Sequence, residues 1–147
     1  MKPNLSVKIG SLKLKNPVIV ASGTFGYGDE FRDFVDPADL GAIVTKTITL
    51  KPREGNRPPR LSETVGGMLN SIGLQNSGLN DFVENKLPSY KNFRTRLIVS
   101  IGGESNSEYA EVASVLSGYK EIDAFELNIS CPNIEYKEKI IAQDEKL

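Results

Sequence analysis

The chain has 147 residues, of which 39% are hydrophobic and 25% charged, and this composition suits one modest globular domain. Eighteen basic and nineteen acidic residues give a net charge of −1, which offers no electrostatic footprint for nucleic acid or an anionic membrane. The first residues lack an apolar run of signal-peptide length, and no stretch approaches the roughly 18 apolar residues of a membrane span. We therefore expect a cytoplasmic protein whose partners are small molecules or proteins.

Short runs along the chain predict strands. Residues 5–9 and 12–14 alternate around Gly10-Ser11, which is typical of a small hairpin. Four apolar or β-branched runs are typical of strands buried on both faces, at residues 17–21, 42–46, 96–101 and 123–129.

Amphipathic segments between these runs predict helices at residues 29–41, 78–87 and 107–119. In the third, Ser107 is the expected N-cap and Gly118 lies near the expected end. Strands that alternate with helices in this order predict a parallel α/β architecture.

The stretch from 49 to 78 is rich in Pro, Gly and Asn. It is too long for an idle connection in a compact domain, so we expect an active-site loop or a small excursion.

The predicted first strand runs into ASGTFGYG, residues 21–28. Glycines permit close backbone approach to a ligand, although a glycine-rich turn without a ligand is the alternative. Gly23, Gly26 and Gly28 do not have the spacing of a dinucleotide-binding fingerprint.

Polar residues follow two further elements. Lys46 ends the second predicted strand, where it is either a solvated end residue or a cation that stabilises a bound anion or reduced cofactor. Asn70 and Asn76 offer amides suited to a cyclic ligand with carbonyl and N–H groups, or they build turns.

Cys131 is the single cysteine, and the chain has no histidine. One cysteine forms no internal disulfide and by itself no zinc or iron–sulfur site, so no metal site is expected. A lone cysteine is commonly a small buried hydrophobe. This one follows a predicted strand, precedes Pro132 and lies between Asn128 and Asn133, so the thiol is placed to meet a ligand.

Four blocks together resemble the class-one dihydroorotate dehydrogenases of the B-type. They are ASGTFGYG, GAIVTKTITLKPREGNRPPR, ETVGGMLNSIGLQNSGL and ELNISCPN, and the resemblance runs colinearly from about residue 5 to residue 133. It implies a (β/α)₈ TIM barrel that carries FMN over the C-terminal ends of its strands and oxidises dihydroorotate to orotate in pyrimidine (UMP) biosynthesis. In that family a base removes the C5 proton while hydride passes from C6 to flavin N5, and Cys131 corresponds to the base.

The resemblance also implies two sets of binding residues. The flavin set is Ala21, Ser22, Gly23, Lys46, Thr47, Ser100 (commonly asparagine in the family) and Asn128. The substrate set is Lys46, Asn70, Ile72, Gly73, Leu74, Asn128 and Asn133.

Partners follow from the same resemblance. B-type catalytic subunits pair with an electron-transfer subunit that carries FAD and a 2Fe–2S cluster and passes electrons to NAD. The catalytic subunits form a homodimer, so the implied assembly is a heterotetramer.

A (β/α)₈ barrel typically needs about 250 residues. We therefore expect residues 1–147 to be the N-terminal half of an FMN-binding barrel domain, about four βα units with a small N-terminal hairpin, cut before the later strands. Three alternatives stay open: an inactive fragment, a noncatalytic binding module of the same fold, and another FMN barrel dehydrogenase that acts on dihydropyrimidines.

Overall fold

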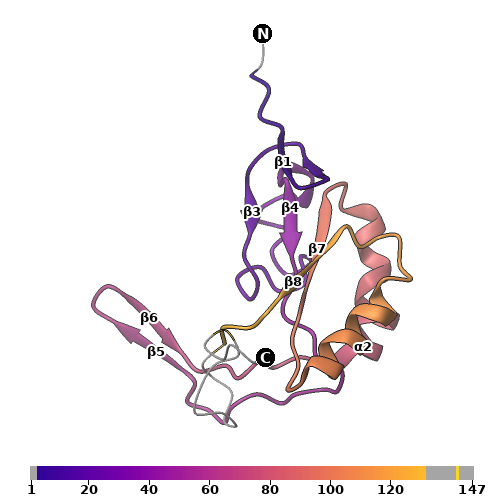
Figure 1. The fold of residues 1–147 in the computed structure, drawn as a ribbon. Helices are drawn as coiled ribbons and strands as arrows, with labels where there is room; N and C mark the ends of the chain where they lie inside the picture. The colour runs from indigo at the N-terminus through magenta and orange to yellow at the C-terminus, as the bar shows by residue number, and fades with distance from the viewer. Residues whose placement is uncertain (1–2, 132–141, 143–147) are drawn as a thin grey trace.

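A computed structural model of the chain describes residues 3–131 and 142. Its centre is a parallel sheet in the order β3-β4-β7-β8 (Figure 1). The strands are β3 (Ile19–Val20), β4 (Ala42–Val44), β7 (Arg96–Ile101) and β8 (Ala124–Leu127). All three pairings are parallel. The four predicted strands and the parallel α/β architecture are therefore confirmed.

One face of the sheet is packed against helices. Leu97, Val99 and Ile101 alternate along β7 and are buried in a core with the helical residues Phe82 and Val112. Alternation places the residues between them on the opposite face, which is the interior side of a barrel. Alternate side chains of β7 thus face the helices on one side of the sheet and the interior of the barrel on the other.

Helix α2 (Asn106–Leu116) is the longest of the described helices and confirms the third predicted helix. Its N-cap is Ser105, whose side chain accepts from the Glu108 backbone N–H. Ser107 was therefore the wrong cap, because it lies inside the first turn. The Ser105-x-x-Glu108 spacing is the signature of a capping box and marks the true start.

The helix expected at residues 29–41 is wrong. Residues 29–35 form consecutive turns, with backbone bonds from Arg32 to Asp29 and from Phe34 to Phe31, and only η1 (Pro37–Asp39) is a short 3₁₀ helix. Asp36 has an extended backbone, as the residue before a proline prefers. Pro37 therefore stops the turns from continuing as a helix.

The second predicted helix is confirmed but changes its pitch along its length. It consists of α1 (Gly78–Asp81), the π-helical η2 (Phe82–Lys86) and the 3₁₀-helical η3 (Leu87–Asn92). None of the helices in the described residues has the length and apolar character needed to cross a bilayer.

Two antiparallel hairpins flank the parallel sheet. The pair β1 (Val7–Ile9) and β2 (Leu12–Leu14) confirms the small N-terminal hairpin. The pair β5 (Leu61–Thr64) and β6 (Gly67–Asn70) lies within the 49–78 stretch and projects from the body of the molecule (Figure 1). This hairpin is the excursion that the composition of the stretch suggested.

A close backbone approach fixes the entry to β4. A Cβ added to Gly41 would lie 2.1 Å from the Asn16 carbonyl oxygen, a backbone atom that has no freedom to move aside. We expect Gly41→Ala to lower the free energy of unfolding by about 1–3 kcal/mol through overpacking. Gly66→Ala is the matched control, since a Cβ there meets nothing within 4 Å. Denaturant unfolding measures both, and equal stability of the two variants would contradict the packing argument.

Candidate active site at the strand ends

The C-terminal ends of the four parallel strands meet at one edge of the sheet, and a cavity of about 510 Å³ lies there. This volume is within the usual range for small-molecule sites. Its walls come from the turn after β3, the end of β4, the β5–β6 hairpin with the segment behind it, and the segment after β8. The lining residues are Ser22, Gly23, Thr24, Lys46, Thr47, Leu61, Met68, Asn70, Ile72, Gly73, Leu74, Gln75, Asn128 and Cys131.

Thr47 joins the strand ends through its hydroxyl. Its Oγ1 atom lies 3.2 Å from Ser22 Oγ and 3.0 Å from Ser100 Oγ, and it accepts from Asn128 Nδ2 at 2.8 Å. One buried oxygen therefore connects residues that follow β3 and β8 with a residue of β7. Such a network holds the polar wall of the cavity in one arrangement.

Removing this hydroxyl should be costly. We expect Thr47→Val to leave the Asn128 amide and the fully buried Ser100 hydroxyl without a partner, and to lower the free energy of unfolding by about 1–3 kcal/mol. Denaturant unfolding measures the loss. Thr24→Val is the control, because Thr24 is exposed and its hydroxyl donates only to the Ala21 carbonyl of its own turn. Similar losses in both variants would argue against the central place of Thr47.

Two residues of the expected flavin set do not line the cavity. Ser100 is fully buried behind Thr47, which separates it from the cavity. Ala21 is exposed beside the cavity, and its carbonyl accepts from the Thr24 backbone and hydroxyl. Both residues support the lining side chains.

Lys46 is partly buried at the cavity wall and is held through its backbone N–H, which donates to the Gly26 carbonyl at 3.0 Å. Burial lowers the pKa of Lys46, the positive charge of Arg60 lowers it further, and Glu30 partly opposes both. Its ammonium makes no hydrogen bond or ion pair with the residues that the structure describes. A half-desolvated cation of this kind is suited to an anionic ligand.

In the glycine-rich turn at residues 21–28, one glycine lies at the ligand cavity and another serves the turn away from it. Gly23 adopts φ +78 and lines the cavity, so this part approaches a ligand site. Gly28 adopts φ +101 and packs against Phe93, where a Cβ would lie 2.6 Å from the ring. Gly28 therefore serves the backbone turn and its packing against Phe93.

The segment behind β6 enters the cavity through a sharp bend. Gly73 and Leu74 adopt positive φ angles of 74° and 55°. A Cβ on Gly73 would lie 2.7 Å from Asn56 Oδ1, and the Asn56 N–H donates to the Ile72 carbonyl at 3.0 Å. Asn70, Ile72, Gly73 and Leu74 all line the cavity. The structure thus brings Lys46 and the expected substrate residues between 70 and 74 together at one cavity.

Asn76 stabilises a turn and does not bind at the cavity. Its side chain accepts from the Thr49 and Gly78 backbone N–H groups and donates to the Leu74 carbonyl. It is buried and does not line this cavity. Of the two asparagines considered for a cyclic ligand, Asn70 faces the cavity and Asn76 builds the turn.

Cys131 lines the cavity and is neither fully buried nor fully exposed. It does not pack into the hydrophobic core, so the alternative of a small buried hydrophobe does not describe it. Asn133, expected to bind substrate, lies outside the described residues.

Four lining residues were missed by the sequence reasoning. They are Thr24, Leu61, Met68 and Gln75. Leu61 and Met68 come from the β5–β6 hairpin, for which the Gly66-Gly67 pair was available as a turn signal. They extend the apolar part of the wall, to which Ile72 and Leu74 also belong.

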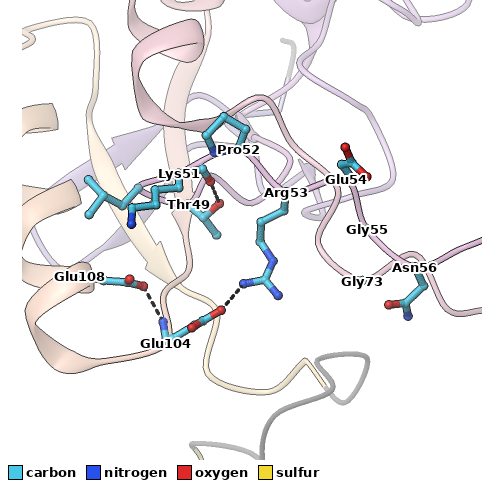
Figure 2. Close-up of a pocket in the computed structure, with 11 residues that line it drawn as sticks. Thr49, Lys51, Pro52, Arg53, Glu54, Gly55, Asn56, Gly73, Glu104 and Glu108 are labelled. Atoms are coloured by element: carbon cyan, nitrogen blue, oxygen red, sulfur yellow. Dashed lines mark hydrogen bonds and ion pairs between the residues drawn. The ribbon is translucent and has the colours of Figure 1, made fainter.

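A second cavity of about 400 Å³ shares Gly73 with the first (Figure 2). There Arg53 Nη1 contacts Glu104 Oε1 at 2.8 Å, and the Glu104 backbone N–H donates to Glu108 at 2.8 Å. These contacts tie the base of the long loop to the first turn of α2.

Comparison with known proteins gives the family of the chain. The dihydroorotate dehydrogenase family profile matches residues 4–147. The chain belongs to the dihydroorotate dehydrogenase family. Its fold fits that assignment: a dihydroorotate dehydrogenase from Eimeria tenella, solved in complex with ferulenol, superposes with a TM-score of 0.73 at 25% identity over 92% of this chain and 39% of its own. The expected partial barrel is therefore confirmed.

Several curated relatives are similar to this chain over most of its length. The chain is 55% identical over 135 residues to the catalytic subunit of dihydroorotate dehydrogenase B (NAD(+)) from Trichlorobacter lovleyi, covering 92% of this chain and 44% of the relative. It is 50% identical over 145 residues to the subunit of the same name from Geobacter sulfurreducens, covering 99% and 48%. The chain thus spans less than half the length of these dihydroorotate dehydrogenases.

Proposed function

We propose that this chain supplies the first four strands and the substrate-facing half of a B-type dihydroorotate dehydrogenase catalytic subunit, which oxidises dihydroorotate to orotate in pyrimidine biosynthesis. Residues 1–147 would then be the N-terminal half of an FMN-binding barrel domain in the cytoplasm. The observation that carries the proposal is the gathering of Lys46, Asn70 and Cys131 around one cavity.

The residues present fit a flavin ring. The Ser22 hydroxyl and the Asn128 side-chain amide offer hydrogen bonds to its carbonyl and N–H positions, Thr47 holds both groups in place, and Gly23 leaves open space beside the backbone. FMN, when bound, supplies the acceptor for the hydride that leaves C6 of dihydroorotate.

The chain's own groups would hold the substrate and move its proton. Asn70 and the segment Ile72–Leu74 would bind the pyrimidine edge and carboxylate, together with Asn128 and Asn133. Lys46 would offset negative charge in the cavity, and its lack of an ion-pair partner among the described residues supports this role. Cys131 Sγ would take the C5 proton while the C5–C6 double bond forms.

Electrons would leave through a partner. The names of the relatives pair a catalytic subunit with NAD, and the single cysteine of this chain cannot hold a cluster. We propose an electron-transfer subunit with FAD and a 2Fe–2S cluster, bound to a homodimer of catalytic subunits in a heterotetramer.

Anaerobic flavin reduction tests the function. The full-length protein, loaded with FMN, should lose its visible flavin absorption when mixed with dihydroorotate and should react far less with dihydrouracil, which lacks the carboxylate. Equal reaction with both compounds would favour another dihydropyrimidine dehydrogenase. No reaction with either would favour a noncatalytic module.

A further inference from the structure

The segment that carries Cys131 has few attachments to the sheet. It leaves β8 at Asn128, whose backbone N–H donates to the Ile101 carbonyl at 2.9 Å. Ile129 and Ser130 are exposed, and the Ile129 carbonyl accepts from the Ala142 backbone N–H at 3.0 Å. Cys131 lies only three residues beyond Asn128, so the position of its thiol depends in part on how firmly Asn128 is held.

Tyr109 reaches Asn128 from the first turns of α2. Its hydroxyl donates to the Asn128 carbonyl oxygen at 2.6 Å. The Asn128 side chain is held separately by Thr47, on the cavity side. Two different elements therefore fix the carbonyl and the amide of one residue.

The Tyr109 ring has little room to move. A Cβ added to Gly103 would lie 3.2 Å from Tyr109 Cδ2 and 2.9 Å from Glu108 Cβ, so the ring lies close against this glycine. Burial raises the pKa of Tyr109, opposed by a backbone hydrogen bond from Gly103, and Cys131 and Glu108 raise it further. The hydroxyl thus remains a neutral donor at physiological pH.

The start of α2 is itself anchored. Ser105 caps the helix, Glu108 accepts from the Glu104 backbone, and Glu104 contacts Arg53 on the long loop (Figure 2). Tyr109 therefore extends from a helix start that is tied to the long loop at Arg53.

We propose that Tyr109 is a positioning residue: its hydrogen bond to the Asn128 carbonyl sets the place of Cys131 at the cavity. The catalytic consequence rests on the proposed function, whereas the effect on the segment does not. A rigid support of this kind matters because a small displacement of a reacting group has a large effect on rate.

Tyr109→Phe in the full-length protein tests the proposal, because the ring and its packing remain while the hydrogen bond is lost. Hydrogen exchange of the peptide containing residues 128–131 should be about fivefold faster, as loss of one typical hydrogen bond allows, while exchange within α2 stays unchanged. The rate at which iodoacetamide alkylates Cys131, measured by mass spectrometry, should differ from that of the wild type by a similar factor. With dihydroorotate, kcat should fall about tenfold and KM should stay within about twofold.

Two further variants sharpen the result. Gly103→Ala keeps the hydroxyl but crowds the ring, and should reproduce the faster exchange. Tyr119→Phe is the matched control, because the Tyr119 hydroxyl makes no hydrogen bond within the described residues, and it should behave as wild type.

The outcomes separate the two proposals. Unchanged exchange and alkylation at residues 128–131 in Tyr109→Phe would overturn the positioning role. If Tyr109→Phe changes the exchange of residues 128–131 but the wild-type protein does not oxidise dihydroorotate, the positioning role is upheld and the proposed function is rejected. Changed exchange with unchanged kcat would also overturn the proposal, because the position of Cys131 would then not matter to the reaction.

Discussion

Cys131→Ala in the full-length, FMN-loaded protein should slow reduction of the flavin by dihydroorotate by about 10²–10⁴-fold, the range that a positioned general base contributes. The thiol lines the cavity, and among the other lining side chains in the described part of the chain Lys46 is the only one that titrates. Because Lys46 is assigned to charge stabilisation, none of the described lining groups is expected to replace the base. Stopped-flow absorbance under anaerobic conditions measures the step directly.

Binding should survive the same substitution. Asn70, Asn128 and the bend at Gly73 do not depend on the thiol, so orotate should still perturb the flavin spectrum with an affinity within a few-fold of wild type. Ser130→Ala is the matched control, because Ser130 is the exposed neighbour and is not among the lining residues. A Cys131→Ala variant that reduces flavin at the wild-type rate would remove Cys131 from the mechanism.

Regular elements were predictable where one local signal dominated. The run RLIVSI forms β7 over residues 96–101, as its β-branched composition indicates. The helix at 29–41 failed because apolar spacing competed with Asp36-Pro37, and the proline constraint determined the backbone. The cap of α2 was misplaced because two serines lie at the start of the helix, and only Ser105 has glutamate three residues later.

The site was predictable to the extent that motifs mark strand ends. Lys46, Thr47 and Asn128 each directly follow or lie near the end of a strand, and parallel pairing brings such residues together. The sequence motifs could not reveal whether a given side chain reaches the cavity or lies behind another side chain. Ser100 is the example: strand alternation directs it inward, but Thr47 lies between it and the cavity.

The contacts that support the site were beyond sequence reasoning. Tyr109 has the spacing of a core position on a helix face, and nothing local distinguishes its hydroxyl as a partner of Asn128. The sequence separation of 19 residues between them is bridged only after α2 packs on the sheet. Asn70 and Asn76 show the same limit, since identical side chains six residues apart serve a cavity and a turn.

Lys46→Met should have opposite effects on activity and stability. The rate of flavin reduction should fall by about 10²-fold, since removal of one preorganised charge from an active site typically costs this much. Stability at neutral pH should rise by less than about 1 kcal/mol, because a partly buried charge is removed but solvent still screens it.

The pH dependence follows from the direction of the Lys46 shift. The pKa is lower in the folded chain than the ordinary value of 10.5, so the unfolded chain holds more protons between these two values. The charged lysine therefore costs stability below the folded pKa, and the cost fades as pH rises toward 10.5. The stability gain of Lys46→Met should shrink over the same window. Denaturant unfolding at a series of pH values measures this, with exposed Lys51→Met as the control. A Lys46→Met variant that is both fully active and no more stable would show that Lys46 is a solvated end residue, and the anion-stabilising role would then have to pass to another group.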